Sequence, residues 1–149
     1  MNKIMHMLNE ENLNRLKERL NNYKFCKTNK NGSMIDPDYA KYVLDLRFQW
    51  DQLAPCIIDM QDYQESENKL LYSKNDVPLI LGYMDCIQQL IKVSNHIVKD
   101  VYSIKLLKLS GSMNKKSTIN IALEMQNNLI NVYDALFDEM LKILEIKKE

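Results

Sequence analysis

Residues that break helices are scarce in this chain of 149 residues, which contains only three glycines and three prolines. Average proteins carry about seven per cent glycine and five per cent proline. Four of the six lie near gaps between long stretches with helical periodicity, at Gly32, Pro37, Pro78 and Gly111. Breakers this sparse leave room for very few turns. The scarcity therefore predicts a few long helices joined by short connections.

Side chains that bind metals or assemble into nucleophilic sites are also few. The two histidines, His6 and His96, have no histidine, glutamate or cysteine partner at the spacing of metal ligands. Cys86 and His96 lie about 15 Å apart along one predicted helix, too far to form a nucleophile–base pair. No glycine-rich phosphate loop is present. We therefore expect no catalytic set, no metal and no cofactor.

The three cysteines indicate a reducing compartment. Cys26, Cys56 and Cys86 are odd in number and form no Cys-x-x-Cys pair, unlike the disulfide frameworks of secreted domains. Cys56 and Cys86 lie within apolar helical runs and are expected to be small core residues. No signal-peptide pattern opens the chain, and no apolar run approaches the roughly 18 residues of a membrane span. A cytoplasmic protein without membrane contact is expected.

Charge is balanced, with 20 lysines and arginines against 20 aspartates and glutamates. Proteins that neutralise many phosphates usually carry a positive excess. Nucleic-acid binding is therefore not favoured, although a local basic patch would be hidden in this average. The lysines expected at one end of the bundle form such a candidate anion-binding patch: Lys27, Lys30, Lys105, Lys108, Lys115 and Lys116.

Apolar spacing predicts four helices, over residues 9–24, 37–66, 76–109 and 117–147. Asn9, Asp36 and Ser117 or Thr118 are candidate N-caps. The three long segments each carry a seam of apolar residues at alternating steps of four and three, as in helical bundles. The seams of the last two expected helices include Ser94 and Met140. The sequence predicts one all-α domain over 1–149, an up-and-down bundle of three long helices plus one short N-terminal helix.

The first helix is too short to cover the whole seam of the second. Part of that seam is expected to stay open as an apolar groove that binds a partner protein or a second copy. Trp50 belongs either to the core or to this groove. The candidate partner-binding residues are Trp50, Ile57, Met60 and Tyr63.

These features favour a non-enzymatic protein–protein interaction module, such as an adaptor, inhibitor, chaperone or small assembly subunit. Two alternatives remain open. The first is a small subunit of a nucleoprotein complex that contacts phosphates through the lysine patch. The second is a magnesium-dependent helical hydrolase, whose nearest carboxylates are Asp59, Asp62 and Glu65 on the second helix.

Overall fold

The computed structural model describes residues 6–21, 23, 39–103 and 115–145. Within these ranges the chain is all-α, without strands. The helices are α1 (Glu10–Leu20), α2 (Tyr39–Glu67), α3 (Val77–Ser103) and α4 (Lys115–Ile143), with a 3₁₀ turn η1 (Lys74–Asp76) before α3. One short and three long packed helices confirm the predicted fold class.

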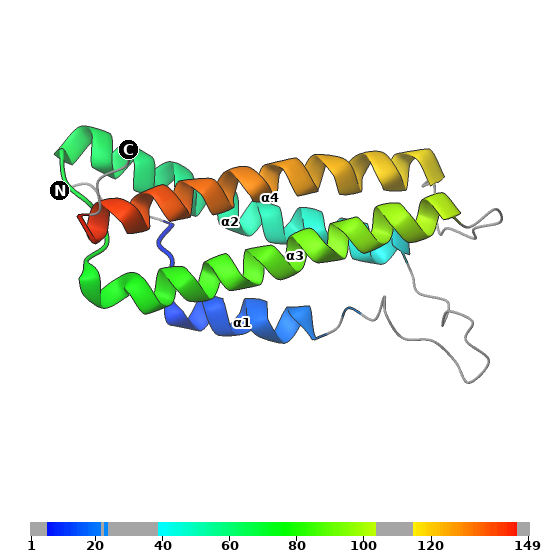
Figure 1. The fold of residues 1–149 in the computed structure, drawn as a ribbon, viewed down its shortest axis with the longest axis horizontal. Helices are drawn as coiled ribbons and strands as arrows, with labels where there is room; N and C mark the ends of the chain where they lie inside the picture. Colours follow the sequence, from blue (N-terminus) through cyan, green and yellow to red (C-terminus); the bar gives the residue numbers. More distant parts are fainter. Residues whose placement is uncertain (1–5, 22, 24–38, 104–114, 146–149) are drawn as a thin grey trace.

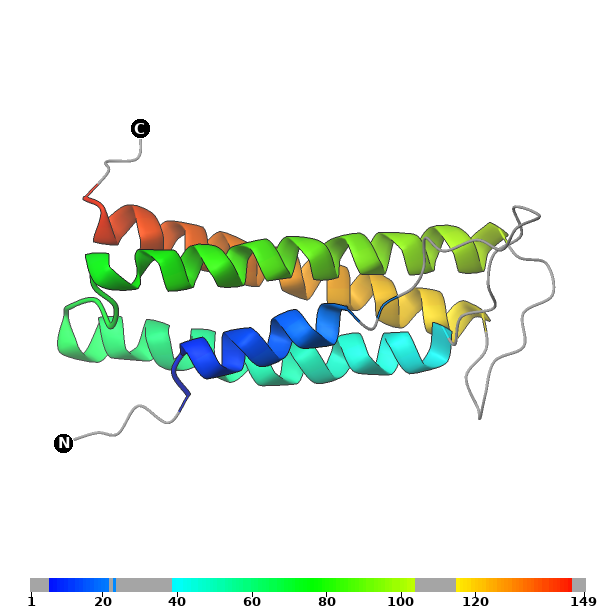
Figure 2. The same ribbon diagram turned by 90° about the horizontal axis from the view of Figure 1, so that it is seen from below.

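Successive helices run in opposite directions, so the bundle is up-and-down (Figure 1). The long helices α3 and α4 share the most extensive contact, and α2 packs mainly on α4. The short α1 lies along the half of α3 that begins at Val77 (Figures 1 and 2). It packs more closely against α3 than against α2. This one-sided attachment of α1 positions the site described below.

Local sequence accounts for several helix ends. The Asn9 side chain accepts a hydrogen bond from the Asn12 backbone N–H at 2.8 Å, as its predicted capping role requires. Helix α3 begins at Val77 with Pro78 in its first turn, where proline is tolerated. Helix α2 ends before Asn68, which has a positive φ of 54°.

The start of α4 differs from prediction. Ser117 and Thr118 are not caps, because the helix already begins at Lys115. Thr118 is fully buried as the first member of the α4 core seam, so its position in the bundle is that of a packing residue. The predicted caps of α2 and the predicted last turn of α3, up to residue 109, lie outside the described residues.

The core consists largely of the predicted seams. The α4 side chains Ala122, Met125, Leu129, Val132 and Leu136 are all at most 3% exposed. Two positions of the predicted α4 core face were wrong. Glu139, 2% exposed, takes the buried place expected for Met140, which is half-buried, and Leu144, also expected in the core, is 38% exposed. The alternation of four and three from Leu136 leads to residue 139, and the helix follows this geometry although the residue there is charged.

Gly82 allows α1 to lie close to α3. A Cβ atom on this residue would lie 2.7 Å from Cδ2 of Leu13, which is shorter than any normal carbon–carbon contact. Leu13 itself is 5% exposed and anchors α1 in the core. The missing side chain of Gly82 thus provides the space into which the α1 anchor packs.

Candidate binding groove

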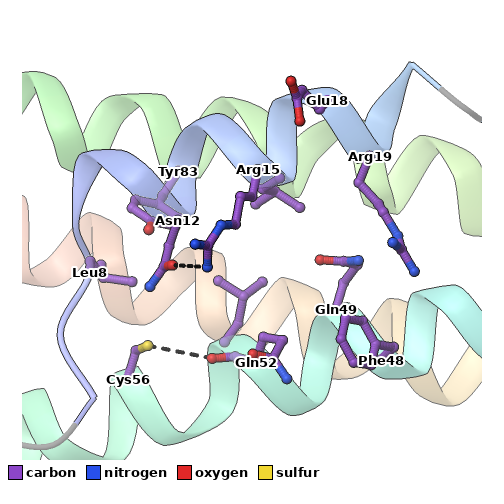
Figure 3. Close-up of a pocket in the computed structure, with 12 residues that line it drawn as sticks. Leu8, Asn12, Arg15, Glu18, Arg19, Phe48, Gln49, Gln52, Cys56 and Tyr83 are labelled. Atoms are coloured by element: carbon purple, nitrogen blue, oxygen red, sulfur yellow. Dashed lines mark hydrogen bonds between the residues drawn. The ribbon is translucent and has the colours of Figure 1, made fainter.

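A groove of about 390 Å³ lies between α1 and α2, and we call it the α1–α2 groove (Figure 3). It exists because α1 packs mainly on α3 and touches α2 chiefly through Arg19. Its floor is mostly apolar and its edges are polar. The floor residues are Leu8, Leu16, Leu53, Cys56 and Tyr83, and the edge residues include Asn12, Arg15, Arg19, Phe48 and Gln52.

One end of the groove is closed by a carboxylate on α2. Asp45 accepts a hydrogen bond from Arg19 Nε at 2.7 Å and a second one from the Tyr23 hydroxyl. Burial, together with the hydrogen bond to Asp45, raises the pKa of Tyr23 well above its ordinary value. Arg19 lies in the last turn of α1 and Tyr23 follows the helix, so this cluster joins the end of α1 to α2.

The segment before α1 closes the opposite end. The backbone N–H of His6 donates to Oδ2 of Asp59 at 2.8 Å, and the His6 ring lies 3.0 Å from the same oxygen. The backbone N–H of Leu8 donates to the Tyr72 hydroxyl at 2.7 Å. Leu8 is 3% exposed, so this segment forms part of the core and covers the neighbouring end of α2.

This cover corrects the predicted location of the open seam. Ile57 is 7% exposed and Met60 is 2% exposed, so neither lines an open groove. Trp50 is half-buried and packs against the core. Tyr63 is half-buried, with the Lys69 ammonium 5.9 Å from the centre of its ring. Partner binding by these four residues stays a prediction, and a partner would reach Ile57 and Met60 only after displacing their cover.

Gln49 is the polar residue on which the groove's chemistry depends. Its side chain is 7% exposed, yet no hydrogen bond joins its amide to another described residue. Figure 3 shows this amide directed from α2 into the space below α1. Unlike Oε1 of Glu139, the Gln49 amide atoms keep some accessible surface toward the groove, where water can reach them. The groove therefore holds a donor and an acceptor that a ligand could satisfy.

The charged groups at the edge of the groove largely neutralise one another. Arg15 lies 2.6 Å from a carboxylate oxygen of Glu11, and Arg19 lies 2.6 Å from Asp45. The Arg19 guanidinium also lies 5.4 Å from the centre of the Phe48 ring. Phe48 is 49% exposed, so its ring offers apolar surface beside paired charges. This balance favours a ligand that is itself close to neutral.

The groove's titratable floor residues are held in their neutral forms. Burial raises the pKa of the Cys56 thiol, whose Sγ donates to the backbone oxygen of Gln52 at 3.4 Å. Burial also raises the pKa of Tyr83 to about 12, and its hydroxyl donates to the Asn9 oxygen at 2.8 Å. A neutral thiol is a poor nucleophile, so Cys56 contributes apolar surface at neutral pH.

The remaining predicted residues are only partly placed. Lys27, Lys30, Lys105 and Lys108 lie outside the described residues, and Cys26 does too. Lys115 is half-buried and Lys116 is exposed, both in the first turn of α4. Their charge there opposes the helix dipole, so dipole compensation does not explain them. Anion binding by this patch stays a prediction.

The carboxylates of the hydrolase alternative do not form a cluster. Asp59 is engaged by His6, while Asp62 and Glu65 are exposed on α2. Within the described ranges, no three histidine, cysteine, aspartate or glutamate side chains gather as metal ligands would. Cys56 and Cys86 are free thiols and buried, as predicted. In the same ranges, no helix combines the length and apolar character that crossing a membrane requires.

Sequence reasoning missed Gln49 and the groove around it. Seam spacing on α2 pointed to Trp50, but Gln49 turned out to be the more deeply buried of the two. A weak signal exists in retrospect, because Gln49, Leu53 and Cys56 follow one another at steps of four and three.

Comparison of this chain with protein-family models, with curated proteins and with solved structures yields no match.

Proposed function

We propose that this chain is a non-enzymatic protein–protein interaction module that holds a short segment of a partner protein in the α1–α2 groove. The observation that carries the proposal is the amide of Gln49, which is directed into the groove above an apolar floor and makes no hydrogen bond to another described residue. A glutamine amide both donates and accepts, as does a peptide group. A polypeptide backbone therefore satisfies this residue more completely than a ligand that only accepts.

The groove also defines what else the partner segment should carry. The apolar floor, formed in part by Leu16 and Leu53, suits a bulky side chain such as leucine, methionine or phenylalanine. The paired charges at the edge give little attraction for a densely charged chain such as a nucleic acid. The helix α1 is about 16 Å long. This length matches an extended segment of about five residues, whose peptide groups are not already paired with each other.

A selection from a displayed library of random 16-residue peptides tests this proposal on the full chain. Enriched peptides are expected to share one or two bulky apolar residues and a low net charge. Replacing Gln49 with leucine removes the amide but keeps much of the volume, and should weaken the selected peptides about tenfold. Phe48→Ala should weaken them by a similar factor or more.

Leu44→Ala serves as the matched control, because Leu44 lies one turn before Phe48 and is 54% exposed outside the groove. Its affinity for the peptides should stay within about twofold of the parent chain. Circular dichroism would check that all variants remain helical. Failure to enrich any peptide, or equal loss of affinity in Leu44→Ala and Phe48→Ala, would contradict the proposal.

A further inference from the structure

Helix α4 carries a second apolar row besides its core seam. Four large apolar side chains recur at steps of seven and are each 38–42% exposed. The backbone N–H of Leu144 donates to the Met140 oxygen at 3.0 Å, so the last of them continues the helical geometry. We call this row the α4 stripe: Leu123, Ile130, Phe137 and Leu144.

The stripe lies on the side of α4 that faces α3. Tyr133 and Gln126, which neighbour the stripe on the helix surface, are hydrogen-bonded to Gln88 and Asn95 of α3. Leu81 lies seven residues before Gln88, hence on the same line along α3, and is 47% exposed. Because α3 and α4 run antiparallel, this line places Leu81 near the Phe137 and Leu144 end of the stripe.

We propose that a second copy of this chain covers the α4 stripe, with the two α4 helices antiparallel about a two-fold axis. Long helices pair through apolar side chains at two positions of a seven-residue repeat, and the α4 stripe supplies one of these positions. A two-fold axis is the commonest symmetry of protein dimers, and it pairs one surface with itself.

The order of residues in the stripe suits self-pairing. Read from either end, a leucine comes first and last, with isoleucine and phenylalanine between them. In an antiparallel pair, Leu123 therefore meets Leu144 of the second copy, and Ile130 meets Phe137. Each central layer then combines a large ring with a smaller branched side chain, which fills space better than two rings would.

The centre of this arrangement carries one charged residue from each copy. Asp134 is exposed beside the stripe, directly after Tyr133. The Tyr133 hydroxyl accepts a hydrogen bond from Gln88 at 3.1 Å, so its own proton is available to an outside acceptor. In the antiparallel pair, each flank of the stripe meets the same flank of the second copy, so Tyr133 lies beside Tyr133 and Asp134 beside Asp134. The exposed Asp134 carboxylates lie at the rim, where salt screens their repulsion.

The face is also large enough for a specific dimer. The α4 stripe is about 32 Å long at 1.5 Å per residue. Two neighbouring helices form a face about 20 Å wide. The footprint is thus about 600 Å² on each copy, or about 1,200 Å² in total, which is the lower bound for stable specific interfaces.

Two matched double variants of the full chain test the inference. Analytical ultracentrifugation over about 1–200 μM should show the parent chain as a dimer that dissociates on dilution. Ile130→Glu with Phe137→Glu should raise the dimer dissociation constant at least about 100-fold, because each change acts twice across the axis. The control is Leu44→Glu with Ile58→Glu on α2, whose residues are 54% and 56% exposed and lie outside the stripe. The control should dimerise like the parent chain.

Orientation is tested by a photoreactive phenylalanine analogue at position 137. The inference expects cross-links to residues around Ile130 of the second copy, which cleavage before Asp134 separates from those around Phe137. Cross-links to α1 or α2, or to position 137 itself, would overturn this arrangement. A parent chain that stays monomeric at 200 μM, or equal loss of dimer in both double variants, would overturn the dimer. Peptide binding in the α1–α2 groove uses other residues and is unaffected by either outcome.

Discussion

Replacing Leu129 with alanine is expected to lower the free energy of unfolding by about 3–5 kcal/mol. Leu129 is 0% exposed, at the middle of the α4 core seam, where α4 packs against both α3 and α2. Truncation removes apolar contacts and leaves a cavity that close-packed neighbours fill only in part. Domains of this size have about 5–15 kcal/mol in total, so a large share of the stability is lost. Denaturant unfolding followed by circular dichroism measures the change.

The adjacent residue provides the control for this experiment. Ile130 is 40% exposed on the α4 stripe, and Ile130→Ala should cost no more than about 1 kcal/mol in the monomer. The measurement belongs at a protein concentration below the dimer dissociation constant, so that self-association does not contribute. Equal losses for the two variants would mean that α4 does not present Leu129 to the core and Ile130 to the surface.

Replacing Glu139 with methionine is expected to stabilise the protein at neutral pH, by about 1–3 kcal/mol. Glu139 is 2% exposed, and its Oε1 atom has no hydrogen-bond partner. Burial raises the pKa of this carboxyl above its ordinary value of 4.5. At this chain length the gain corresponds to a melting temperature higher by about 3–10 °C.

The pH dependence of this gain identifies its cause. An acid whose folded pKa is raised favours the protonated folded state, so the parent chain keeps this contribution below pH 4.5 and loses it as pH rises through the folded pKa. The advantage of Glu139→Met should therefore be small near pH 4 and grow toward pH 7. Glu124→Met, at an exposed position on the same helix, should change stability by less than about 0.5 kcal/mol. A less stable Glu139→Met at pH 7 would show that the carboxylate has a partner.

Much of the fold was predictable because long helices leave a regular signal. Apolar residues at steps of four and three indicated α2, α3 and α4, and the Asn9 cap and Pro78 indicated where α1 and α3 begin. The prediction failed at Met140 and Glu139 because two criteria disagreed there. Polarity favoured Met140 for the core, whereas the angular spacing of the helix favoured residue 139. The helix follows its angular spacing, and the packing of α4 places Glu139 in the core at a cost in free energy.

The candidate groove was less predictable, because its existence depends on which of the long helices α1 packs against. The expected open seam included Ile57 and Met60, but the chain before α1 crosses to Asp59 and Tyr72 and covers that end of α2. Periodicity identifies the apolar face of a short helix without stating against which partner it packs. Because α1 packs mainly on α3, the amide of Gln49 on α2 faces the groove.

The sequence by itself determined that this protein is helical, how many long helices it has and which side of each is apolar, because these follow from local spacing and from the scarcity of breakers. Only the tertiary structure decided that α1 packs against α3, with Leu13 beside Gly82, and that the α1–α2 groove stays open. It also decided that one apolar row of α4 is core while the α4 stripe stays at the surface. Both decisions depend on contacts between residues far apart in the chain, and a local pattern carries no record of them.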